Sequence, residues 1–519
     1  MPAQGDDRDP IGQLFLVDFG ETGPSGEITR LIAEGGVGGV VLFDKNIRDP
    51  GQVASLTNAL QRHAAAVRRP PLLVAADQEG GPVVRLRGTH FPSAMAFGAA
   101  GSDDLVAAAA EATARELRAV GIHVNFAPDL DVNSNPANPV IGVRSYGEDP
   151  ALVARLGTRA VTAMQAGGVL ATAKHFPGHG DTAQDSHLAL PTVGHPRDRL
   201  EAIEFPPFRE AIRAGVAAVM TAHVVYPALD PDHPATLSPA IIGMLRTEMG
   251  FGGLVVSDSM RMRAIADLLG PGEAAVQAVL AGVDLVLALG PAEVQWEALR
   301  AVRAAAAGGR IPEARIREAA DRVVAAKRRL GLFDNAFVQE NAVPRRVGLP
   351  EHTALAGRVA AAAATLVRGQ RGMPPLPPGS IQVAAGLAPQ ETTERLAQAL
   401  RAKGRTAMTV GLDRGGDRGA APDRTAPIVL PLADSAPGGP VTRERILAVT
   451  AAALKRGPVV VVATAAPYAL AHVPQECAAL AVYGADPSTL QAAAAVLTGA
   501  VRPGGRLPVT IASPTAPEV

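Results

Sequence analysis

The chain contains a single cysteine, one tryptophan and few other aromatic residues in its 519 positions. Because Cys477 stands alone, it can form no internal disulfide, and no zinc site can be built from cysteine. Phe, Trp and Tyr together make up only 3% of the chain, which excludes cores built mainly on large rings. We therefore expect aliphatic cores that are rich in helix.

Long apolar runs and an excess of charge of either sign are also missing. No stretch approaches the ~18 uninterrupted apolar residues that a membrane helix needs, and residues 1–10 lack the apolar segment of a secretory signal. The 49 basic and 50 acidic side chains leave a net charge of −1, which favours neither nucleic acid nor an anionic membrane surface as a partner. A reducing cytoplasm is the expected location, and the oligomeric state is left open.

Short apolar segments recur through the first two thirds of the chain. They lie at 14–19, 37–43, 72–77, 123–128, 169–175, 217–223, 254–258 and 283–289. Between them lie segments of helical character, such as 103–120, 149–165 and 197–214. Alternating strands and helices predict a parallel sheet with right-handed crossovers. Eight such strands favour a (β/α)8 TIM-type barrel in the α/β class, and a doubly wound open sheet is the alternative.

A second region has weaker strand signals, which again alternate with helical stretches. They lie at 381–385, 407–410, 428–431, 459–463 and 479–483. We expect a barrel at residues 1–334, a linker at 335–350 and a smaller α/β layered sandwich domain at 351–519. The basic triplet Lys327–Arg329 ends the last helix of the barrel region and is expected to complement the helix dipole. The Gly- and Arg-rich segment 413–423 predicts a loop.

Polar residues stand where the expected strands of the first region end. They are Asp18, Asp77, Asp129, Asp131, Lys174, His175, His223 and Asp258. In a parallel barrel these ends converge on one rim, the face where barrel enzymes hold their catalytic residues. Helix capping accounts for one or two such residues, but it accounts poorly for a Lys–His pair at the end of a buried strand.

The richest polar segment, residues 174–187, is Lys-His-Phe-Pro-Gly-His-Gly-Asp-Thr-Ala-Gln-Asp-Ser-His. Pro177 and Gly178 exclude a regular helix after the strand, so the segment is expected to be a loop. Its His-x3-His spacing resembles that of zinc proteases, but those proteins carry the motif on a helix with Glu after the first His. A Ser-His-Asp esterase is also disfavoured, because Ser186 lacks the Gly-x-Ser-x-Gly context. No metal is expected.

Two carboxylates, Asp185 in the segment 174–187 and Asp258 at a strand end, suit acid–base and nucleophilic chemistry. Asp185 precedes His187 by two residues, so it can accept a hydrogen bond from one ring nitrogen and leave the other as a general acid or base. Asp258 ends an apolar strand, where a carboxylate can attack an electrophilic carbon. A surface hydrogen bond for the pair and an N-cap for Asp258 are the simpler interpretations, and the residues alone leave both open.

Taken together, these motifs resemble glycoside hydrolase family 3, and within it the bacterial β-N-acetylglucosaminidases of cell-wall recycling. Residues 174–187 are similar to the signature of that group over their whole length. The resemblance extends through 77–81, 144–147, 257–258, 483–484 and 503–509. It covers most of the chain and implies a barrel followed by an α/β sandwich, with retaining hydrolysis through a covalent glycosyl-enzyme.

By position, the resemblance implies that Asp258 is the nucleophile, His187 the general acid/base and Asp185 its assisting carboxylate. The residues that match those holding the terminal sugar are Asp77, Arg85, Arg144, Lys174 and His175. Pro82 departs from the family pattern, because Arg commonly follows the Gly-Gly pair at this point. No cofactor is implied.

The expected activity is that of an exo-β-N-acetylglucosaminidase that removes non-reducing GlcNAc from muropeptide-derived sugars or short chitooligosaccharides. Three alternatives are a β-N-acetylglucosaminide phosphorylase of the same family, a β-glucosidase, and a sugar-binding protein without turnover. An imidazole repels an incoming phosphate less than a carboxylate would, which keeps the phosphorylase open. The presence of both Asp258 and His187 argues against a binding protein.

Overall fold

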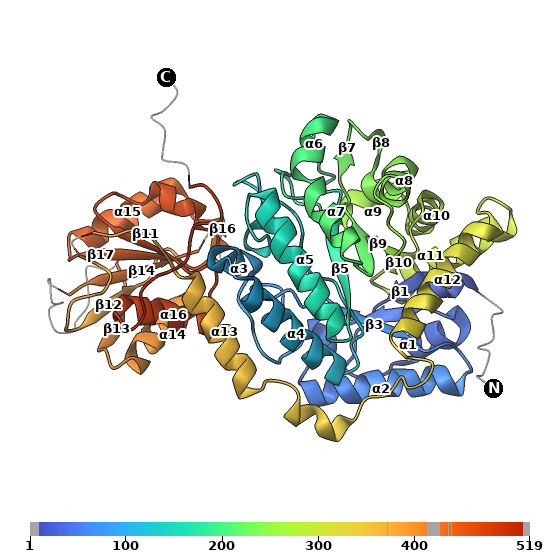
Figure 1. The fold of residues 1–519 in the computed structure, drawn as a ribbon, viewed down its shortest axis with the longest axis horizontal. Coiled ribbons are helices and arrows are strands. Elements are labelled where there is room, and N and C mark those ends of the chain that lie inside the picture. Colours follow the sequence, from blue (N-terminus) through green and yellow to red (C-terminus); the bar gives the residue numbers. More distant parts are fainter. Residues whose placement is uncertain (1–9, 371, 413–425, 434, 437–438, 512–519) are drawn as a thin grey trace.

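The computed structural model describes residues 10–370, 372–412, 426–433, 435–436 and 439–511. It consists of a barrel surrounded by helices and a smaller sheet domain beside it (Figure 1). The predicted loop at 413–423 lies outside the described residues. In the part of the chain that is described, no helix is both long and apolar enough to cross a membrane.

Eight parallel strands close the barrel in the order β1-β10-β9-β6-β5-β4-β3-β2. They are β1 (Phe15–Val17), β2 (Gly39–Val41), β3 (Leu73–Ala76), β4 (Val124–Asn125), β5 (Leu170–Phe176), β6 (Ala218–Thr221), β9 (Leu254–Ser259) and β10 (Leu285–Ala288). Each strand overlaps one of the eight predicted segments. The predicted barrel is confirmed, and the open sheet is wrong because β1 pairs with β10, as in Phe15 with Val286.

Burial on both faces explains why these strands are nearly continuous apolar runs. Along β1, Leu16 joins the cluster inside the barrel, whereas Phe15 and Val17 pack outward with the helices. The inner cluster takes residues from every strand, among them Val41 and Leu73. Period-two alternation therefore fills the barrel interior and the outer layer at the same time.

Twelve α-helices lie in the barrel part within the described residues. They are α1 (Gly26–Arg30), α2 (Pro50–Ala66), α3 (Ala94–Ala100), α4 (Asp103–Ala119), α5 (Pro150–Ala166), α6 (Arg197–Ile203), α7 (Phe205–Arg213), α8 (Pro239–Thr247), α9 (Arg263–Ala266), α10 (Pro271–Ala281), α11 (Ala292–Ala307) and α12 (Glu313–Arg329). The single helix expected at 197–214 is divided into α6 and α7. Pro206 and Pro207 cannot donate backbone hydrogen bonds to the preceding turn, which accounts for the break.

The sheet domain is built on six strands in the order β11-β18-β17-β14-β12-β13. They are β11 (Thr365–Arg368), β12 (Ile381–Ala384), β13 (Ala407–Val410), β14 (Ile428–Leu432), β17 (Val459–Ala463) and β18 (Ala478–Ala481). Its helices are α14 (Gln390–Ala402), α15 (Arg443–Leu454) and α16 (Pro487–Leu497), and β15 (Ser435–Ala436) pairs with β16 (Gly439–Pro440) in a short hairpin. A second hairpin, β7 (Val225–Tyr226) with β8 (Asp230–Pro234), follows β6 in the barrel part. The predicted layered domain is confirmed, whereas the antiparallel strand β11 was not predicted.

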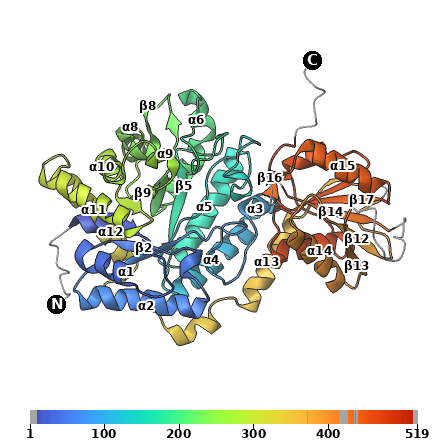
Figure 2. The same cartoon turned by 180° about the vertical axis from the view of Figure 1, so that it is seen from behind.

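Helix α13 (Pro350–Ala363) runs from the barrel to the sheet domain and packs against helices of both (Figure 2). Before it, a 3-10 helix at Glu340–Arg345 packs on α2, within the predicted linker. Hydrogen bonds also join the two parts near the barrel rim, for example from Ser93 Oγ to Tyr483 O at 2.7 Å. The exact domain limits at 334 and 350 stay predictions.

Lys327 in the last turn of α12 does not behave as predicted. Arg328 and Arg329 are exposed, but Lys327 is fully buried and its ammonium donates to Gln13 Oε1 at 2.6 Å. Burial lowers the pKa of Lys327 from 10.5 to about 7. The dipole explanation therefore fails for this residue, which sits at the end of the barrel opposite the rim.

We expect Lys327→Met to change the pH dependence of stability. Because the folded-state pKa lies below the unfolded one, the unfolded chain binds more protons between about pH 7 and pH 10, so wild-type stability rises with pH there. Between pH 7 and pH 9 the wild type should gain on the order of 2 kcal/mol relative to Lys327→Met, measured by urea unfolding. The exposed Lys403→Met serves as control. Equal pH slopes for Lys327→Met and wild type would contradict the expectation.

Candidate active site

The end of β5 places Lys174 and His175 at the barrel rim, joined by a cis peptide bond. Lys174 is buried; its ammonium donates to Asp77 Oδ1 at 2.9 Å and lies 2.6 Å from Glu79 Oε1. Burial works to lower the pKa of Lys174, but the two carboxylates outweigh it and raise the pKa above its ordinary value. Both carboxylates follow β3, so one charged contact joins the ends of two strands.

Arg144 completes this charged network from the 3-10 helix at Gly142–Arg144. Its Nε and Nη2 donate to Glu79 Oε2 and Oε1 at 2.8 and 2.9 Å, a two-point contact, and Nη1 donates to Val140 O at 3.3 Å. Burial works to raise the pKa of Glu79, but Arg144 and Lys174 hold it well below the usual range. Arg144 is therefore paired before any ligand arrives, which the sequence did not predict.

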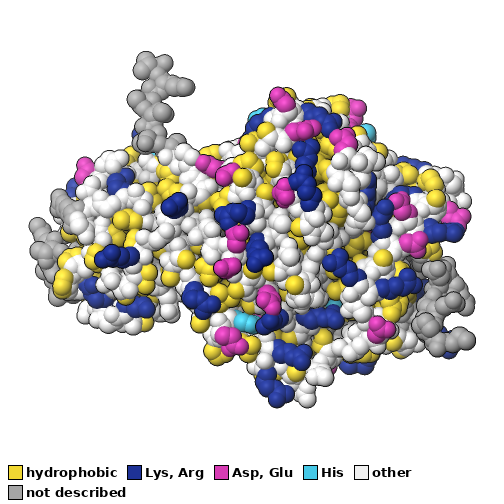
Figure 3. All heavy atoms as spheres, viewed as in Figure 1, with side chains coloured by type: hydrophobic (Ala, Val, Ile, Leu, Met, Phe, Trp, Pro, Cys, Tyr) yellow, Lys and Arg dark blue, Asp and Glu magenta, His cyan; other side chains and the backbone are white. Residues whose placement is uncertain are grey.

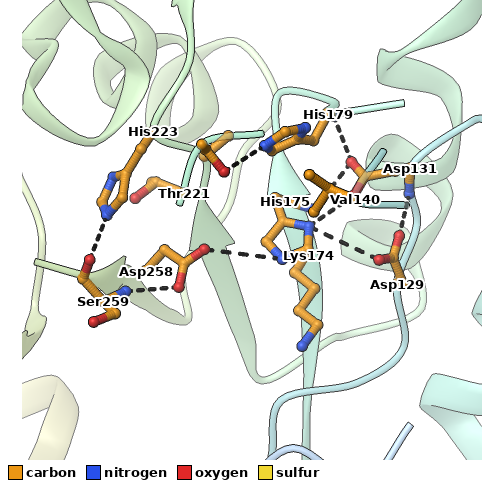
Figure 4. A network of polar contacts seen from close by, with 12 residues as sticks. Asp129, Asp131, Val140, Lys174, His175, His179, Thr221, His223, Asp258 and Ser259 are labelled. Atoms are coloured by element: carbon orange, nitrogen blue, oxygen red, sulfur yellow. Dashed lines mark hydrogen bonds and ion pairs between the residues drawn. The ribbon is translucent and has the colours of Figure 1, made fainter. Parts of the chain in front are cut away.

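His175 is oriented by Asp131, a residue that follows β4 (Figure 4). Its Nδ1 lies 2.7 Å from Asp131 Oδ2, while its Nε2 lies 4.0 Å from Asp258 Oδ2. Burial lowers the pKa of His175 to about 4, so the ring is neutral at pH 7. With Nδ1 donating to the carboxylate, Nε2 carries a lone pair and presents an acceptor to the space beside Asp258.

Asp258 lies near the end of β9. Its Oδ1 accepts a hydrogen bond from Ser259 N at 2.6 Å, which leaves Oδ2 turned toward His175 (Figure 4). Burial works to raise the pKa of Asp258, but His175, His223 and Lys174 outweigh it and hold the pKa below its ordinary value. The carboxylate is thus an anion at neutral pH, with one oxygen not engaged by the backbone.

The predicted pair Asp185 and His187 is formed on the loop after β5. His187 Nδ1 lies 2.8 Å from Asp185 Oδ1, and the same oxygen accepts from His187 N at 2.8 Å. The loop is anchored from below by the buried His179, whose two ring nitrogens lie 2.9 Å from Ser186 Oγ and 2.9 Å from Thr182 Oγ1. Ser186 thus faces inward, while the imidazole of His187 is 60% exposed.

One cavity of about 460 Å³, here called the rim cavity, brings these side chains together. The predicted residues on its wall are Asp77, Arg85, Arg144, Lys174, His175, His187 and Asp258. Asp185 does not line it and contacts it only through His187. Asp18 is also absent from the wall, because it is engaged by Lys45 Nζ at 2.6 Å and by Gln295 Nε2 at 3.0 Å.

Arg85 reaches the rim cavity in spite of the departure at Pro82. Its backbone N donates to Gln78 Oε1 at 2.8 Å, and its guanidinium lies 5.8 Å from the centre of the Phe43 ring and 3.4 Å from Asp44 Oδ2. The Nε atom is buried and has no hydrogen-bond partner among the described residues. The residue itself lines the rim cavity, where its guanidinium can meet a ligand.

Three residues beside the rim cavity are a conceivable cation site. Asp129, Asp131 and His175 each offer one ligand atom, and these atoms lie within 4.8 Å of one another. They already serve other contacts, since Asp131 holds Nδ1 of His175 and Asp129 Oδ2 lies 3.5 Å from Arg144 Nη2. That the site needs no metal stays a prediction.

Several residues of the site were not predicted as site residues, although each stands in a motif or at a strand end that the sequence analysis noted. Glu79 stands inside the Asp77–Gly81 motif, and Asp129 and Asp131 were noted only as strand-end residues. Their partners lie far away in the sequence, which is why their pairing could not be predicted. His179 belongs to the polar segment 174–187 but acts as an anchor for the loop.

Family models match both parts of the chain. Residues 8–326 match the glycosyl hydrolase family 3 N-terminal domain, and residues 440–518 match the family 3 C-terminal domain. Among solved structures, a family 3 β-N-acetylglucosaminidase from Paenibacillus sp. str. FPU-7 superposes with a TM-score of 0.86 at 38% identity, covering 98% of this chain and 99% of that one. A β-glucoside phosphorylase shares the fold, with a TM-score of 0.83 at 21% identity over 98% of this chain and 94% of that one.

Two curated relatives are similar over shorter lengths. Beta-hexosaminidase A of Pseudoalteromonas piscicida is 42% identical over 53% of this chain and 52% of its own length. A beta-N-acetylglucosaminidase/beta-glucosidase of Cellulomonas fimi is 34% identical over 72% of this chain and 67% of its own. The chain thus spans about half the length of the first relative. Because the N-terminal family model alone covers more than half of the chain, and the resemblance seen in residues 174–187 agrees with it, the chain belongs to glycosyl hydrolase family 3.

Proposed function

We propose that the chain is a retaining exo-β-N-acetylglucosaminidase, acting in the cytoplasm on muropeptide-derived sugars or short chitooligosaccharides. One observation carries the proposal: an anionic Asp258 and an Asp185-paired His187 line the same cavity. The names of the relatives from Pseudoalteromonas piscicida and Paenibacillus support the choice of sugar. The cavity is large enough for one sugar ring, because small-molecule sites commonly span ~300–1,000 Å³.

In the first step, Oδ2 of Asp258 attacks the anomeric carbon, because Oδ1 is held by Ser259 N. The bond to the glycosidic oxygen breaks, and the protonated His187 gives its Nε2 proton to that oxygen. In the second step, a water molecule loses a proton to Nε2 and attacks the same carbon, which releases the Asp258 carboxylate. Two inversions leave the anomeric configuration unchanged.

The charges around the rim cavity favour a transition state with positive charge on the sugar. Lys174 and Arg144 are already paired with Glu79, and His175 is neutral at pH 7. In this network, therefore, no unpaired cation opposes the stabilisation that the anionic Asp258 gives to positive charge at the anomeric centre. Carboxylates fixed in place before the reaction stabilise developing positive charge without reorganisation at the moment of bond breaking.

The remaining polar groups suit the hydroxyls of a terminal sugar. Asp77 can accept a hydrogen bond from a sugar hydroxyl, and the neighbouring Lys174 can donate one. Nε2 of His175 is a second acceptor. Arg85 lines the cavity and offers its guanidinium as a donor. We assign these residues to sugar binding, in which contacts that tighten in the transition state raise turnover more than affinity.

The leaving group has room beyond the rim cavity. A second cavity of about 1060 Å³ lies between the barrel and the sheet domain and shares Val140 and Arg144 with the rim cavity. Tyr468 and Arg395 line it from the sheet domain. This arrangement suits an exo-acting enzyme, in which one terminal sugar enters the rim cavity and the rest of the substrate lies outside it.

Asp258→Ala should abolish turnover and covalent labelling without loss of fold. Wild-type protein treated with a mechanism-based fluorinated N-acetylglucosaminyl inactivator should gain one sugar mass on the peptide that contains Asp258, measured by intact-protein and peptide mass spectrometry. Turnover of Asp258→Ala should fall by about 10⁴-fold or more. Asp267→Ala removes an exposed carboxylate just after α9, and this matched control should label normally. Labelling on another residue would remove Asp258 as the nucleophile.

His187→Ala should discriminate between leaving groups. Loss of the proton donor should slow chitobiose cleavage by about 10²–10⁴-fold and affect an aryl glycoside with an acidic phenol much less, measured as kcat/KM. His195, which pairs with Asp181 on the same loop, provides the control variant His195→Ala. An equal loss on both substrates would mean that the imidazole of His187 is not the proton donor.

The first product should be free β-GlcNAc, even in phosphate buffer. Proton NMR during the first minutes follows the anomeric signal before mutarotation, and retention predicts the β-anomer. Accumulation of GlcNAc 1-phosphate would favour the phosphorylase instead.

Paired nitrophenyl β-glycosides of GlcNAc and glucose decide between the hexosaminidase and the β-glucosidase, and a higher kcat/KM for the GlcNAc compound is expected.

A further inference from the structure

A separate cavity of about 610 Å³ lies at the other end of the barrel, between α4, the 3-10 helix at Glu340–Arg345 and the start of α13. The cavity runs along the outer side of α4 from Ala108 to Ala119, and the C-terminal end of α4 leads into the beginning of β4, so the cavity extends toward the end of the barrel opposite the catalytic rim. It shares no lining residue with the rim cavity. Figure 3 shows dark blue side chains crowded over this lower part of the surface, with some magenta ones among them.

Five arginines line this space, here called the arginine cavity. They are Arg115, Arg118, Arg345, Arg346 and Arg358. Only two carboxylates, those of Glu111 and Glu351, share the wall, and the first is paired with Arg115. Unlike Arg115 and Arg118, the other three arginines make no ion pair or side-chain hydrogen bond with any described residue. Such a concentration of positive charge stands out in a chain of net charge −1.

A buried histidine and a helix end face the same space. His352 is only 7% exposed, and its Nδ1 lies 2.7 Å from Glu116 Oε1, so its orientation is fixed. Its Nε2 has no partner within the described ranges, and the residue lines the cavity. The residue before α13, Leu349, also lines the cavity and makes no side-chain cap to the helix, whose first N–H groups follow Pro350. Uncapped amides at a helix start favour an anion.

We propose that the arginine cavity binds a small organic phosphate of nucleotide or sugar-phosphate size. Guanidinium groups match phosphoryl oxygens with two parallel hydrogen bonds, and three of them are without partners in the described structure. The volume exceeds that of a single phosphate and suits a ligand with a non-ionic part, for which Ala108, Ala112 and Leu355 form an apolar wall. The bound ligand would join α4 of the barrel to α13, which continues to the sheet domain.

Binding is tested on the full chain by calorimetry and thermal unfolding with four probes. These are adenosine triphosphate, a hexose 6-phosphate, pyrophosphate and inorganic phosphate, with adenosine and the free hexose as uncharged controls. At least one of the two organic phosphates should bind one to one, raise the Tm and weaken with added salt, whereas the uncharged controls should do neither. The two organic probes separate a nucleotide site from a sugar-phosphate site. Binding of the inorganic anions alone, or of no probe, would overturn the proposal.

Three variants assign the binding to this cavity. Arg346→Gln/Arg358→Gln should weaken the organic phosphate by about tenfold or more, and it should leave glycoside turnover unchanged. Arg62→Gln/Arg159→Gln removes two exposed helical arginines elsewhere and should bind like wild type. Glu351→Gln removes a negative charge from the wall and should tighten binding several-fold. Undiminished binding by the first variant, or weaker binding by Glu351→Gln, would refute the site.

Discussion

The rim depends on the contact of the Lys174 ammonium with Asp77 and Glu79. Burying a cation is costly unless carboxylates pair with it, and here the partners come from a different strand of the barrel. Arg144 then binds Glu79 at two points, so the same carboxylate fixes β5 and the 3-10 helix at Gly142–Arg144 together. Removing Glu79 would take a carboxylate from both Lys174 and Arg144 at once. This mutual dependence holds the rim cavity open in one shape, with its polar groups at fixed distances.

A second set of charges sets the electrostatic character of the site. Burial and the neighbouring Asp131 raise the pKa of Asp129 well above its ordinary value. Burial raises the pKa of Asp131 to about 6, which leaves it mostly anionic and able to accept from Nδ1 of His175. At pH 7 the imidazole of His175 is neutral, and its Nε2 faces Asp258 as an acceptor. Burial works to raise the pKa of Asp258, but His175, His223 and Lys174 outweigh it, so the carboxylate is anionic at neutral pH. An anionic carboxylate at this position suits the cationic transition state of the proposed reaction.

The sequence predicted the barrel well because its strands are buried on both faces and bounded by polar residues. Leu254–Val256 is a continuous apolar run, Leu170–Ala173 is apolar except for Thr172, and both lead into site residues. What it could not predict were pairings over long distances. Glu79 meets Arg144 across 65 residues, and Lys327 meets Gln13 across 314, so no local pattern distinguishes these side chains from solvated ones. The short antiparallel strand β11 was missed for the same reason, since among the described strands it pairs with β18 alone, more than a hundred residues away.

The two ends of the barrel use arginine in opposite ways. At the rim, Arg144 is buried and bound by carboxylates before a ligand arrives, so it shapes the site without adding free positive charge. At the other end, Arg345, Arg346 and Arg358 stand around a cavity without such partners. A net charge of −1 for the whole chain therefore conceals a molecule that is negative where a sugar cation would form and positive where an anion would bind. Because the two cavities share no lining residue, the charge at one end can change without altering the contacts at the other.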